Sequence, residues 1–221
     1  MVPEQVVILA DVSDPLTDGQ AKVVNARLEE VFASLKDYGK ISIFFLTQNK
    51  DDGQVVLGPR LELCRPPSGE NADEWTMPVS KMRRRFKQRF QDVVDDFLAQ
   101  EAFKGKISTS PLAENISVII SYFDKHNIKN YTENRFIIIS DLIENTRSTT
   151  NQYLGLGLSP SKLVKLHDPA LAKSEISVYV LLIERDRHRI LGIGKHQKFW
   201  QEYFDLKGIM STAFELVKRN P

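Results

Sequence analysis

Four mostly apolar runs constrain the fold of this chain more than any other feature of its sequence. They occupy residues 6–10 (VVILA), 41–46 (ISIFFL), 135–140 (RFIIIS) and 176–183 (ISVYVLLI), and the first is apolar at every position. A strand that is apolar on both of its faces is buried on both, which is typical of parallel sheets. Segments with helical spacing separate these runs. The alternation predicts an α/β fold of the three-layer, Rossmann-like type, with a mostly parallel central sheet flanked by helices on both faces.

The segments between the apolar runs complete this prediction. The spacing of Val24, Leu28, Val31 and Leu35 predicts a helix over about 15–36. Further expected elements are a hairpin-like strand over 54–64 with a turn or bulge at Gly58-Pro59 and helices over 80–98, 111–123 and 196–204. The segment 208–217 is expected to be an edge strand or a helix, with the strand favoured. In the helix over 80–98 we expect Ser80 as N-cap and Met82, Phe86, Phe90, Val93 and Phe97 on the buried face. No stretch reads as a linker, so residues 1–221 are predicted to form a single domain.

Composition excludes several classes of protein. Lys and Arg total 30 against 29 for Asp and Glu, and this net charge of +1 argues against a protein that coats nucleic acid by bulk charge. The lone Cys64 excludes an internal disulfide and a cysteine-based zinc site. No apolar run is long enough to span a membrane and no signal peptide is evident. The first strand begins close to Met1, as in a trimmed chain, so an upstream anchor stays open, and with it the choice between cytoplasm and periplasm.

Two of the predicted strands end directly in an acid, Asp11 after VVILA and Asp141 after FIIIS. If both strands are central and parallel, the two carboxylates meet at the carboxyl edge of the sheet, where ligands of such folds bind. Short hydroxyl side chains follow the first strand and precede the predicted helix at Pro111: Ser13, Thr17, Ser108, Thr109 and Ser110. Two carboxylates and several hydroxyls suit a hard cation such as Mg²⁺.

These motifs, VVILADVSDPLT, STSPLAENI and IIISDLIEN, resemble in order and strand context the metal-ion-dependent adhesion site of von Willebrand factor A-type (integrin I-like) domains, in particular bacterial ones. The resemblance covers most of the chain. It implies a metal site made by Asp11, Ser13, Ser110 and Asp141, with Asp14, Thr17 and Thr109 as additional residues of the metal shell. The implied ion is Mg²⁺, with Mn²⁺ or Ca²⁺ as substitutes. The sequence departs from the family pattern at Pro15, where a second serine is usual, and at Leu142, where glycine is usual, so the metal site is degenerate.

A second feature is a run of cations on the predicted helix over 80–98. It comprises Lys81, Arg83, Arg84, Arg85, Lys87 and Arg89. Such a run is ordinarily a solvated face, and Asp92, Asp95 and Asp96 stand at spacings that could pair with Arg85 or Arg89. The functional interpretation is a patch for anionic partners, with nucleic acid the least favoured because no aromatic residues are interleaved. Most of the four histidines, at 126, 167, 188 and 196, are expected at the surface, and Trp200 is expected to be a packing or lid residue.

Three functions follow from these observations. The resemblance implies a non-enzymatic protein-interaction module, in which a partner's acidic side chain fills an open coordination position of the cation. The alternatives are a scaffold that has lost the metal site and binds anionic partners through the basic helix, and a metal-dependent phosphohydrolase. The last is disfavoured because Ser13 stands where such an enzyme needs a second acid.

Overall fold

The computed structural model describes residues 4–11, 14–48, 55–67, 78–99, 110–125, 131–144, 158–166, 174–186 and 188–219. Six of their segments form one sheet in the order β3-β2-β1-β4-β5-β6. The strands are β1 (Glu4–Asp11), β2 (Lys40–Gln48), β3 (Val55–Cys64), β4 (Glu133–Ser140), β5 (Ser174–Ile183) and β6 (Ile209–Val217). All neighbouring strands are parallel except β3, which is antiparallel to β2. This order is that of doubly wound α/β folds, and the predicted mostly parallel sheet is confirmed.

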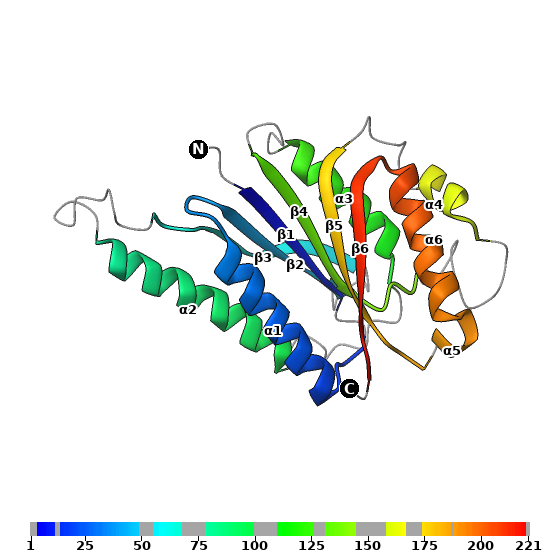
Figure 1. Ribbon diagram of the computed structural model, residues 1–221, viewed down its shortest axis with the longest axis horizontal. Helices are drawn as coiled ribbons and strands as arrows, with labels where there is room; N and C mark the ends of the chain where they lie inside the picture. Colours follow the sequence, from blue (N-terminus) through cyan, green and yellow to red (C-terminus); the bar gives the residue numbers. More distant parts are fainter. Residues whose placement is uncertain are drawn as a thin grey trace.

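Helices cover both faces of the sheet (Figure 1). On one face lie α1 (Asp18–Ser34) and α2 (Val79–Leu98), and on the other lie α3 (Leu112–Lys125), α4 (Pro160–Leu166) and α6 (Ile193–Leu206), with the short α5 (His188–Leu191) beside α6. Alternate residues of β1 serve the two cores. Val6 and Ile8 pack in the cluster with α1 and α2, whereas Val7 and Leu9 pack in the cluster with α3 and α6. The apolar runs are therefore buried on both faces, and the three-layer prediction is confirmed.

Helix α2 departs from the predicted pattern at its start. It begins at Val79 with Pro78 as N-cap and no side-chain cap bond, so the expectation that Ser80 caps it was wrong. Proline can take this place because its fixed φ suits a helix start and it has no N–H to satisfy. The buried face includes Val79 and Val94, while Met82 is 39% exposed and Val93 only partly buried. The predicted positions are 4, 4, 3 and 4 residues apart, so they do not all lie on one side of the helix. The buried face is set by the large side chains between Phe86 and Phe97.

The remaining elements agree with the sequence. Strand β3 is irregular at the expected place, since its register with β2 shifts between the pairs Ile43–Leu61 and Phe44–Pro59. The last segment is strand β6, parallel to β5 at the far edge of the sheet. Trp200 is fully buried against Tyr203 and Phe204, as expected of a packing residue. Among the described helices, none combines the length and apolar character needed to cross a bilayer.

The packing of α2 generates a stability prediction. Phe90 is 2% exposed, and its ring stacks on Phe32 of α1 with centroids 4.4 Å apart. Phe90→Ala should lower the free energy of unfolding by about 3–5 kcal/mol, because it removes buried apolar surface and leaves a cavity. The exposed Met82→Ala should change it by less than about 1 kcal/mol. Urea denaturation followed by circular dichroism measures both, and equal losses would contradict the packing described for α2.

Candidate functional site

The parallel pairing of β1 with β4 brings Asp11 and Asp141 to the same edge of the sheet. Asp11 is the last residue of β1, and Asp141 directly follows β4. The two strands are paired up to Ala10 and Ile139, so both acids lie at the carboxyl edge of the sheet. The carboxyl ends of β1 and β4 are in the lower part of Figure 1. Both side chains are largely buried, with 7% of Asp11 and 6% of Asp141 exposed. The predicted convergence of the two acids at one edge is confirmed.

Two serine hydroxyls hold the Asp11 carboxylate. Ser140 Oγ donates to Asp11 Oδ2 at 2.9 Å, and Ser110 Oγ donates to the same oxygen at 3.3 Å. Ser140 Oγ also accepts from the backbone N–H of Leu142 at 2.8 Å, which fixes the direction of its own proton. Ser110 lies just before α3 and is buried. Three segments distant in sequence therefore meet at one carboxylate oxygen, and Ser140 is a contact that the sequence did not predict.

The Asp141 carboxylate is held in a tight turn after β4. Its Oδ1 accepts from the backbone N–H of Ile143 at 2.9 Å. Between them, Leu142 has a φ of 56°, in the left-handed region that glycine adopts more readily than any other residue. Leu142 is fully buried in the core with α3 and α6. Burial of its side chain therefore offsets the backbone strain, and the Gly-to-Leu departure leaves the turn intact.

The electrostatics of the pair are unfavourable for two ionised carboxylates. Burial and the negative charge of Asp11 raise the pKa of Asp141 well above its ordinary value, and Asp14 adds to this effect. The N–H of Ile143 and the guanidinium of Arg185 act in the opposite direction. Two buried carboxylates in this arrangement form a site that a cation would stabilise, because it would neutralise their mutual repulsion. The donor set of carboxylate and hydroxyl oxygens fits a hard divalent ion.

Side chains of α5 and α6 form hydrogen bonds to backbone carbonyls of the same turn. Nε2 of His188 and Nε2 of His196 lie 2.9 and 3.0 Å from the carbonyl oxygen of Asp141, and Trp200 donates to the carbonyl of Leu142 at 2.7 Å. The two histidines are 2% and 3% exposed, so the expectation that they lie at the surface was wrong. Their polar sequence neighbours were misleading, because α5 and α6 pack these two imidazoles against the turn after β4. His126 and His167 lie outside the described residues.

The geometry around His188 assigns its proton. Its Nδ1 accepts from the backbone N–H of Arg185 at 3.0 Å, so Nε2 must carry the hydrogen that is donated to Asp141. A second proton on Nδ1 would face the N–H of Arg185. Burial lowers the pKa of His188 and lowers that of His196 to about 4. Both imidazoles are therefore neutral donors at neutral pH, and they position the turn rather than carry charge.

Glu144 is a further residue that the sequence did not single out. It is fully buried, and its Oε2 accepts from the backbone N–H of Ala113 at 2.8 Å, in the first turn of α3. A carboxylate is favourable there because the first turn of a helix presents unpaired N–H groups and positive potential. The bond joins the turn after β4 to the segment that carries Ser110. No local pattern could reveal it, since the two partners are 31 residues apart.

The other predicted shell residues have different places. Ser13 and Thr109 lie outside the described residues. Thr17 is the N-cap of α1 in a capping box with Gln20, and its hydroxyl also donates to the carbonyl of Arg219 at 3.1 Å. The carbonyl of Asp14 accepts from Arg185 at 2.8 Å. Within the described ranges, no three His, Cys, Asp or Glu side chains are grouped to hold a metal, so a cation here would rest on two acids, hydroxyls and water.

A polar depression of about 680 Å³ adjoins the acidic pair. It is bounded by the end of β5, by α5 and α6, and by the C-terminal segment, and its lining includes Glu184, Arg185, Asp186, His188 and Arg219. His188 connects the two places, because the same imidazole that lines the depression bonds to Asp141. Charges of both signs line it, and Arg219 is paired with Asp186. The surface next to the candidate site is thus shaped and polar.

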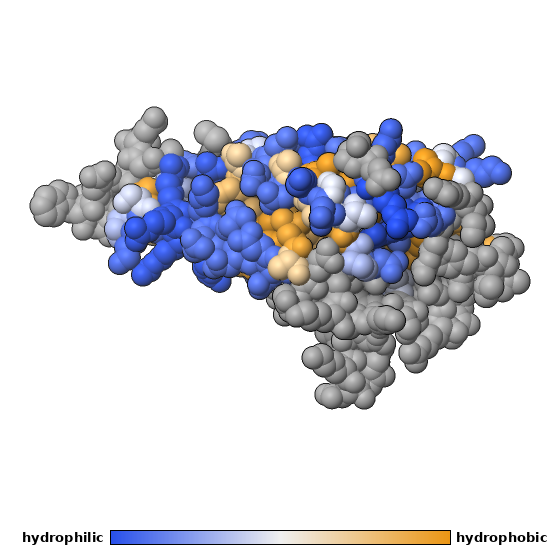
Figure 2. Space-filling model, turned by 90° about the horizontal axis from the view of Figure 1, so that it is seen from below, coloured by the Kyte–Doolittle hydropathy of each residue, from blue (hydrophilic) through white to orange (hydrophobic). Residues whose placement is uncertain are grey.

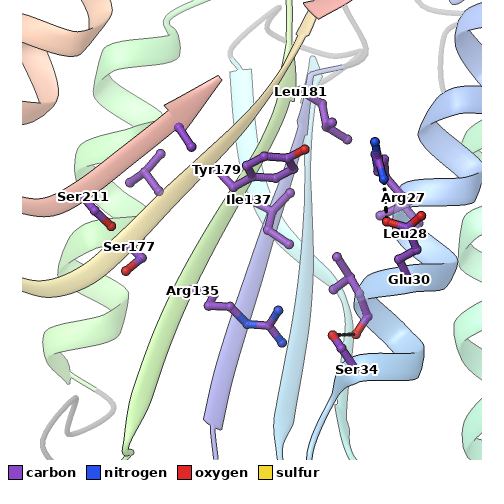
Figure 3. Close-up of a pocket in the computed structure, with 13 residues that line it drawn as sticks. Arg27, Leu28, Glu30, Ser34, Arg135, Ile137, Ser177, Tyr179, Leu181 and Ser211 are labelled. Carbon is purple, nitrogen blue, oxygen red and sulfur yellow. Dashed lines mark hydrogen bonds and ion pairs between the residues drawn. The ribbon is translucent and has the colours of Figure 1, made fainter. Parts of the chain in front are cut away.

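A second cavity, of about 480 Å³, lies between α1 and the strands β4, β5 and β6 (Figure 3). Its charged lining residues already have partners: Arg27 pairs with Glu215 and Glu30, and Arg135 pairs with Glu4. Tyr179 bonds to Glu215 as well. This cavity is remote from the acidic pair and offers no uncompensated charge to a ligand.

The predicted basic residues lie on α2. Arg83 is partly occupied, since it donates to the carbonyl of Pro67 at 2.9 Å and pairs with Asp37 at 3.4 Å. The other cations are exposed: Lys81, Arg84, Arg85, Lys87 and Arg89. Figure 2 shows a strongly hydrophilic surface at the end of the molecule where α2 lies. The acids of the same helix were expected to pair with its cations. Instead, Asp92 and Asp95 accept hydrogen bonds from the side-chain amides of Gln88 and Gln91.

No protein-family model matches the sequence, and no curated protein matches it. Among solved structures, the VWA domain of SpRpn10 is similar, with a TM-score of 0.43 and 10% sequence identity; the match covers 98% of this chain and 90% of that chain. The function therefore has to be inferred from the residues of this chain.

The buried histidines generate a pH prediction for the metal-free protein. Because the pKa of His196 falls from 6.5 to about 4 on folding, the unfolded chain binds more protons in this interval, and stability from His196 is lost as pH falls through it. The loss is up to about 3 kcal/mol. Asp141 acts oppositely, since its raised pKa means that the folded state binds more protons.

The contribution of His196 to the pH dependence of stability is therefore obtained by comparing wild type with a variant that lacks this histidine. His196→Gln keeps an amide donor but cannot titrate, so the stability difference between wild type and variant should shrink as pH falls from about 7 to about 4. Urea denaturation in EDTA at several pH values measures it. A difference independent of pH would contradict a neutral, buried His196.

Proposed function

We propose that this chain is a non-enzymatic protein-interaction module that holds one divalent cation, Mg²⁺, at the carboxyl edge of its sheet. Asp11, Ser110 and Asp141 would hold the ion, together with water and the predicted hydroxyls of Ser13 and Thr109. The observation that carries the proposal is the pair of buried carboxylates at the ends of adjacent parallel strands, with a raised pKa at Asp141. A cation bound there supplies an open coordination position, which a carboxylate oxygen of the partner fills.

The support around the pair favours a preorganised binding site. The Asp11 oxygen accepts from Ser110 and Ser140, and the turn of Asp141 is held by His188 and His196. Few groups would have to move when an ion binds, because the oxygens are already directed by hydrogen bonds. The resemblance to the von Willebrand factor A-type motifs points to the same residues.

A protein partner is favoured over a small substrate by the surroundings. The polar depression beside the site carries charges of both signs, as polar rims of protein interfaces do. The residues nearest Asp141 do not act as proton carriers: both ring nitrogens of His188 are engaged, and His196 donates to a backbone carbonyl. A metal-dependent phosphohydrolase would need a second acid at position 13, where this chain has Ser13. Binding without turnover is the function we infer.

Metal binding is tested by two matched variants. With Mg²⁺ at about one hundred times its Kd, the free energy of unfolding of the wild type should rise by about 2.7 kcal/mol. Asp11→Asn and Asp141→Asn should abolish this rise, because each removes one negative charge from the pair. Urea denaturation with Mg²⁺ or with EDTA measures the effect, with Asp18→Asn, an exposed acid of α1, as control.

The same variants separate a metal site from a capping role. In EDTA at pH 8, Asp141→Asn should raise the stability by about 1–3 kcal/mol, because the neutral amide removes the repulsion from Asp11 and keeps an oxygen for the Ile143 N–H. If the carboxylates served only as caps, the variant would be neutral or destabilising. A wild type that Mg²⁺ does not stabilise would overturn the proposal and favour a scaffold whose metal site is lost.

The open coordination position is tested with acetate as a substitute for the partner's side chain. Mn²⁺ bound to the protein should broaden the carboxyl ¹³C resonance of acetate more than that of ethanol, because only the carboxylate enters the coordination shell. Asp141→Asn at the same total Mn²⁺ should reduce this broadening to that of free Mn²⁺. Equal broadening by wild type and variant would contradict an open metal site on this edge.

A further inference from the structure

The outward face of α2 carries opposite charges on its two halves. At about 100° per residue, the buried face of α2 centres on Phe86, Phe90 and Phe97, and the side opposite to it covers about a third of the helix circumference. This outward stripe consists of Lys81, Arg84, Arg85, Gln88, Asp92, Asp95 and Asp96. All seven are exposed. Three cations thus occupy the N-terminal half and three anions the C-terminal half, with an uncharged residue between them.

The cations of the stripe have no partner in the part of the chain that the structure describes. Lys81, Arg84 and Arg85 take part in none of the hydrogen bonds or ion pairs found there. On the acidic half, Asp92 and Asp95 accept one hydrogen bond each, at 2.7 and 2.8 Å, from Gln88 and Gln91. A carboxylate has further lone pairs, so both can accept more bonds. The stripe therefore offers charges of both signs to a partner.

Helix stability does not account for this arrangement. Backbone dipoles make the N-terminus of a helix positive and its C-terminus negative, so acids are favourable in the first turns and bases in the last. On α2 the order is reversed: Lys81, Arg84 and Arg85 stand toward the N-terminus and the acids toward the C-terminus. The core of the domain does not need these exposed residues either. An arrangement that costs local stability is explained if another molecule compensates the charges.

We propose that the outward stripe of α2 is the contact surface for a second copy of this chain, with the two α2 helices antiparallel about a two-fold axis at Gln88. In this register, Lys81 faces Asp95 of the second copy and Arg84 faces its Asp92. The reciprocal pairs form at the same time, as in any isologous contact. Arg85 stands one residue from the second of these pairs, and Asp96 one residue from the first. Every charge of the stripe lies near an opposite charge.

Other partners match the stripe less well. An anionic membrane or a nucleic acid would attract the basic half and repel the acidic half, which begins about 10 Å further along the same helix. The chain as a whole has a net charge of +1, so two copies do not repel each other strongly. An antiparallel pair of helices also places opposite ends of their dipoles together. A second copy is the partner with the required pattern of charge along the helix.

The expected association is weak and depends on salt. A single helix pair buries less surface than a standard stable interface, and its contacts are mainly exposed ion pairs. We expect a Kd on the order of 0.1 mM at low ionic strength. Raising the salt from about 0.05 M to about 0.5 M should weaken it at least tenfold, because the screening length falls to a few ångströms.

Charge-reversal variants of the full chain test the proposal by sedimentation equilibrium. The acidic variant carries Lys81→Glu, Arg84→Glu and Arg85→Glu, and the basic variant carries Asp92→Lys, Asp95→Lys and Asp96→Lys. Each alone should be monomeric where the wild type dimerises, because its stripe has one sign only. Their equimolar mixture should form a heterodimer at least as tight as the wild-type dimer. Thermal unfolding checks that each variant is folded.

A matched control reverses three exposed cations elsewhere: Lys165→Glu, Lys195→Glu and Lys198→Glu. It should dimerise like the wild type. The measurements are made in EDTA, so that metal binding at Asp11 and Asp141 has no influence and failure of either proposal is recognised separately.

Three results would overturn the proposed pairing. They are a wild type that stays monomeric at millimolar concentration, variants that still dimerise alone, and a mixture that does not associate. Binding of the monomeric wild type to phosphatidylserine vesicles, lost in the acidic variant, would assign the basic half to a membrane instead.

Discussion

The parallel pairing of β1 with β4 is the constraint on which the candidate site depends. Because the strands run side by side in one direction and in register, their carboxyl ends cannot separate, and neither can Asp11 and Asp141. Layers of helices on both faces bury this end of the sheet. Burial and like charge then act together to raise the pKa of Asp141. The arrangement is unfavourable for the isolated chain and favourable for a chain with a cation, which is why we regard it as a binding site.

The residues around the pair act on the backbone more than on the carboxylates. Two imidazoles donate to the carbonyl oxygen of Asp141, and an indole N–H donates to that of Leu142. The carboxylate of Glu144 accepts from a backbone N–H of α3 and so joins the turn to that helix. The donors of these bonds come from core-packed helices, so the turn moves only if the core moves. A left-handed Leu142 is tolerated for the same reason, since its side chain is part of that core. The rigidity of the edge is thus a property of the fold.

The outward stripe of α2 and the acidic pair use charge differently. At the edge of the sheet, two acidic side chains are buried together, and the cation that we propose would compensate their charge. On α2, charges of both signs are exposed and separated along one helix, so water screens them and only an extended, oppositely ordered surface satisfies them together. The stripe points away from the sheet that carries Asp11 and Asp141. Pairing of two copies through α2 would therefore leave the carboxyl edge of each sheet open to a partner.

The sequence by itself determined the layers, the strands and the two acids. Continuous apolar runs require burial on both faces, and an acid directly after such a run must lie at the end of its strand; both are local properties. The sequence predicted burial less well for residues whose surroundings come from distant segments. His188 and His196 look like surface residues in their polar stretches, and only the packing of α5 and α6 against the turn after β4 buries them.

Only the tertiary structure decided which groups contact the acids. The bond of Ser140 to Asp11 spans 129 residues, and that of Glu144 to Ala113 spans 31, so neither has a local signature. The start of α2 and the exposure of Met82 were also decided by packing, because a helical spacing gives the period of the buried face and not its direction. Periodicity is a property of the sequence, whereas the partners of each buried polar atom depend on how the layers pack against one another.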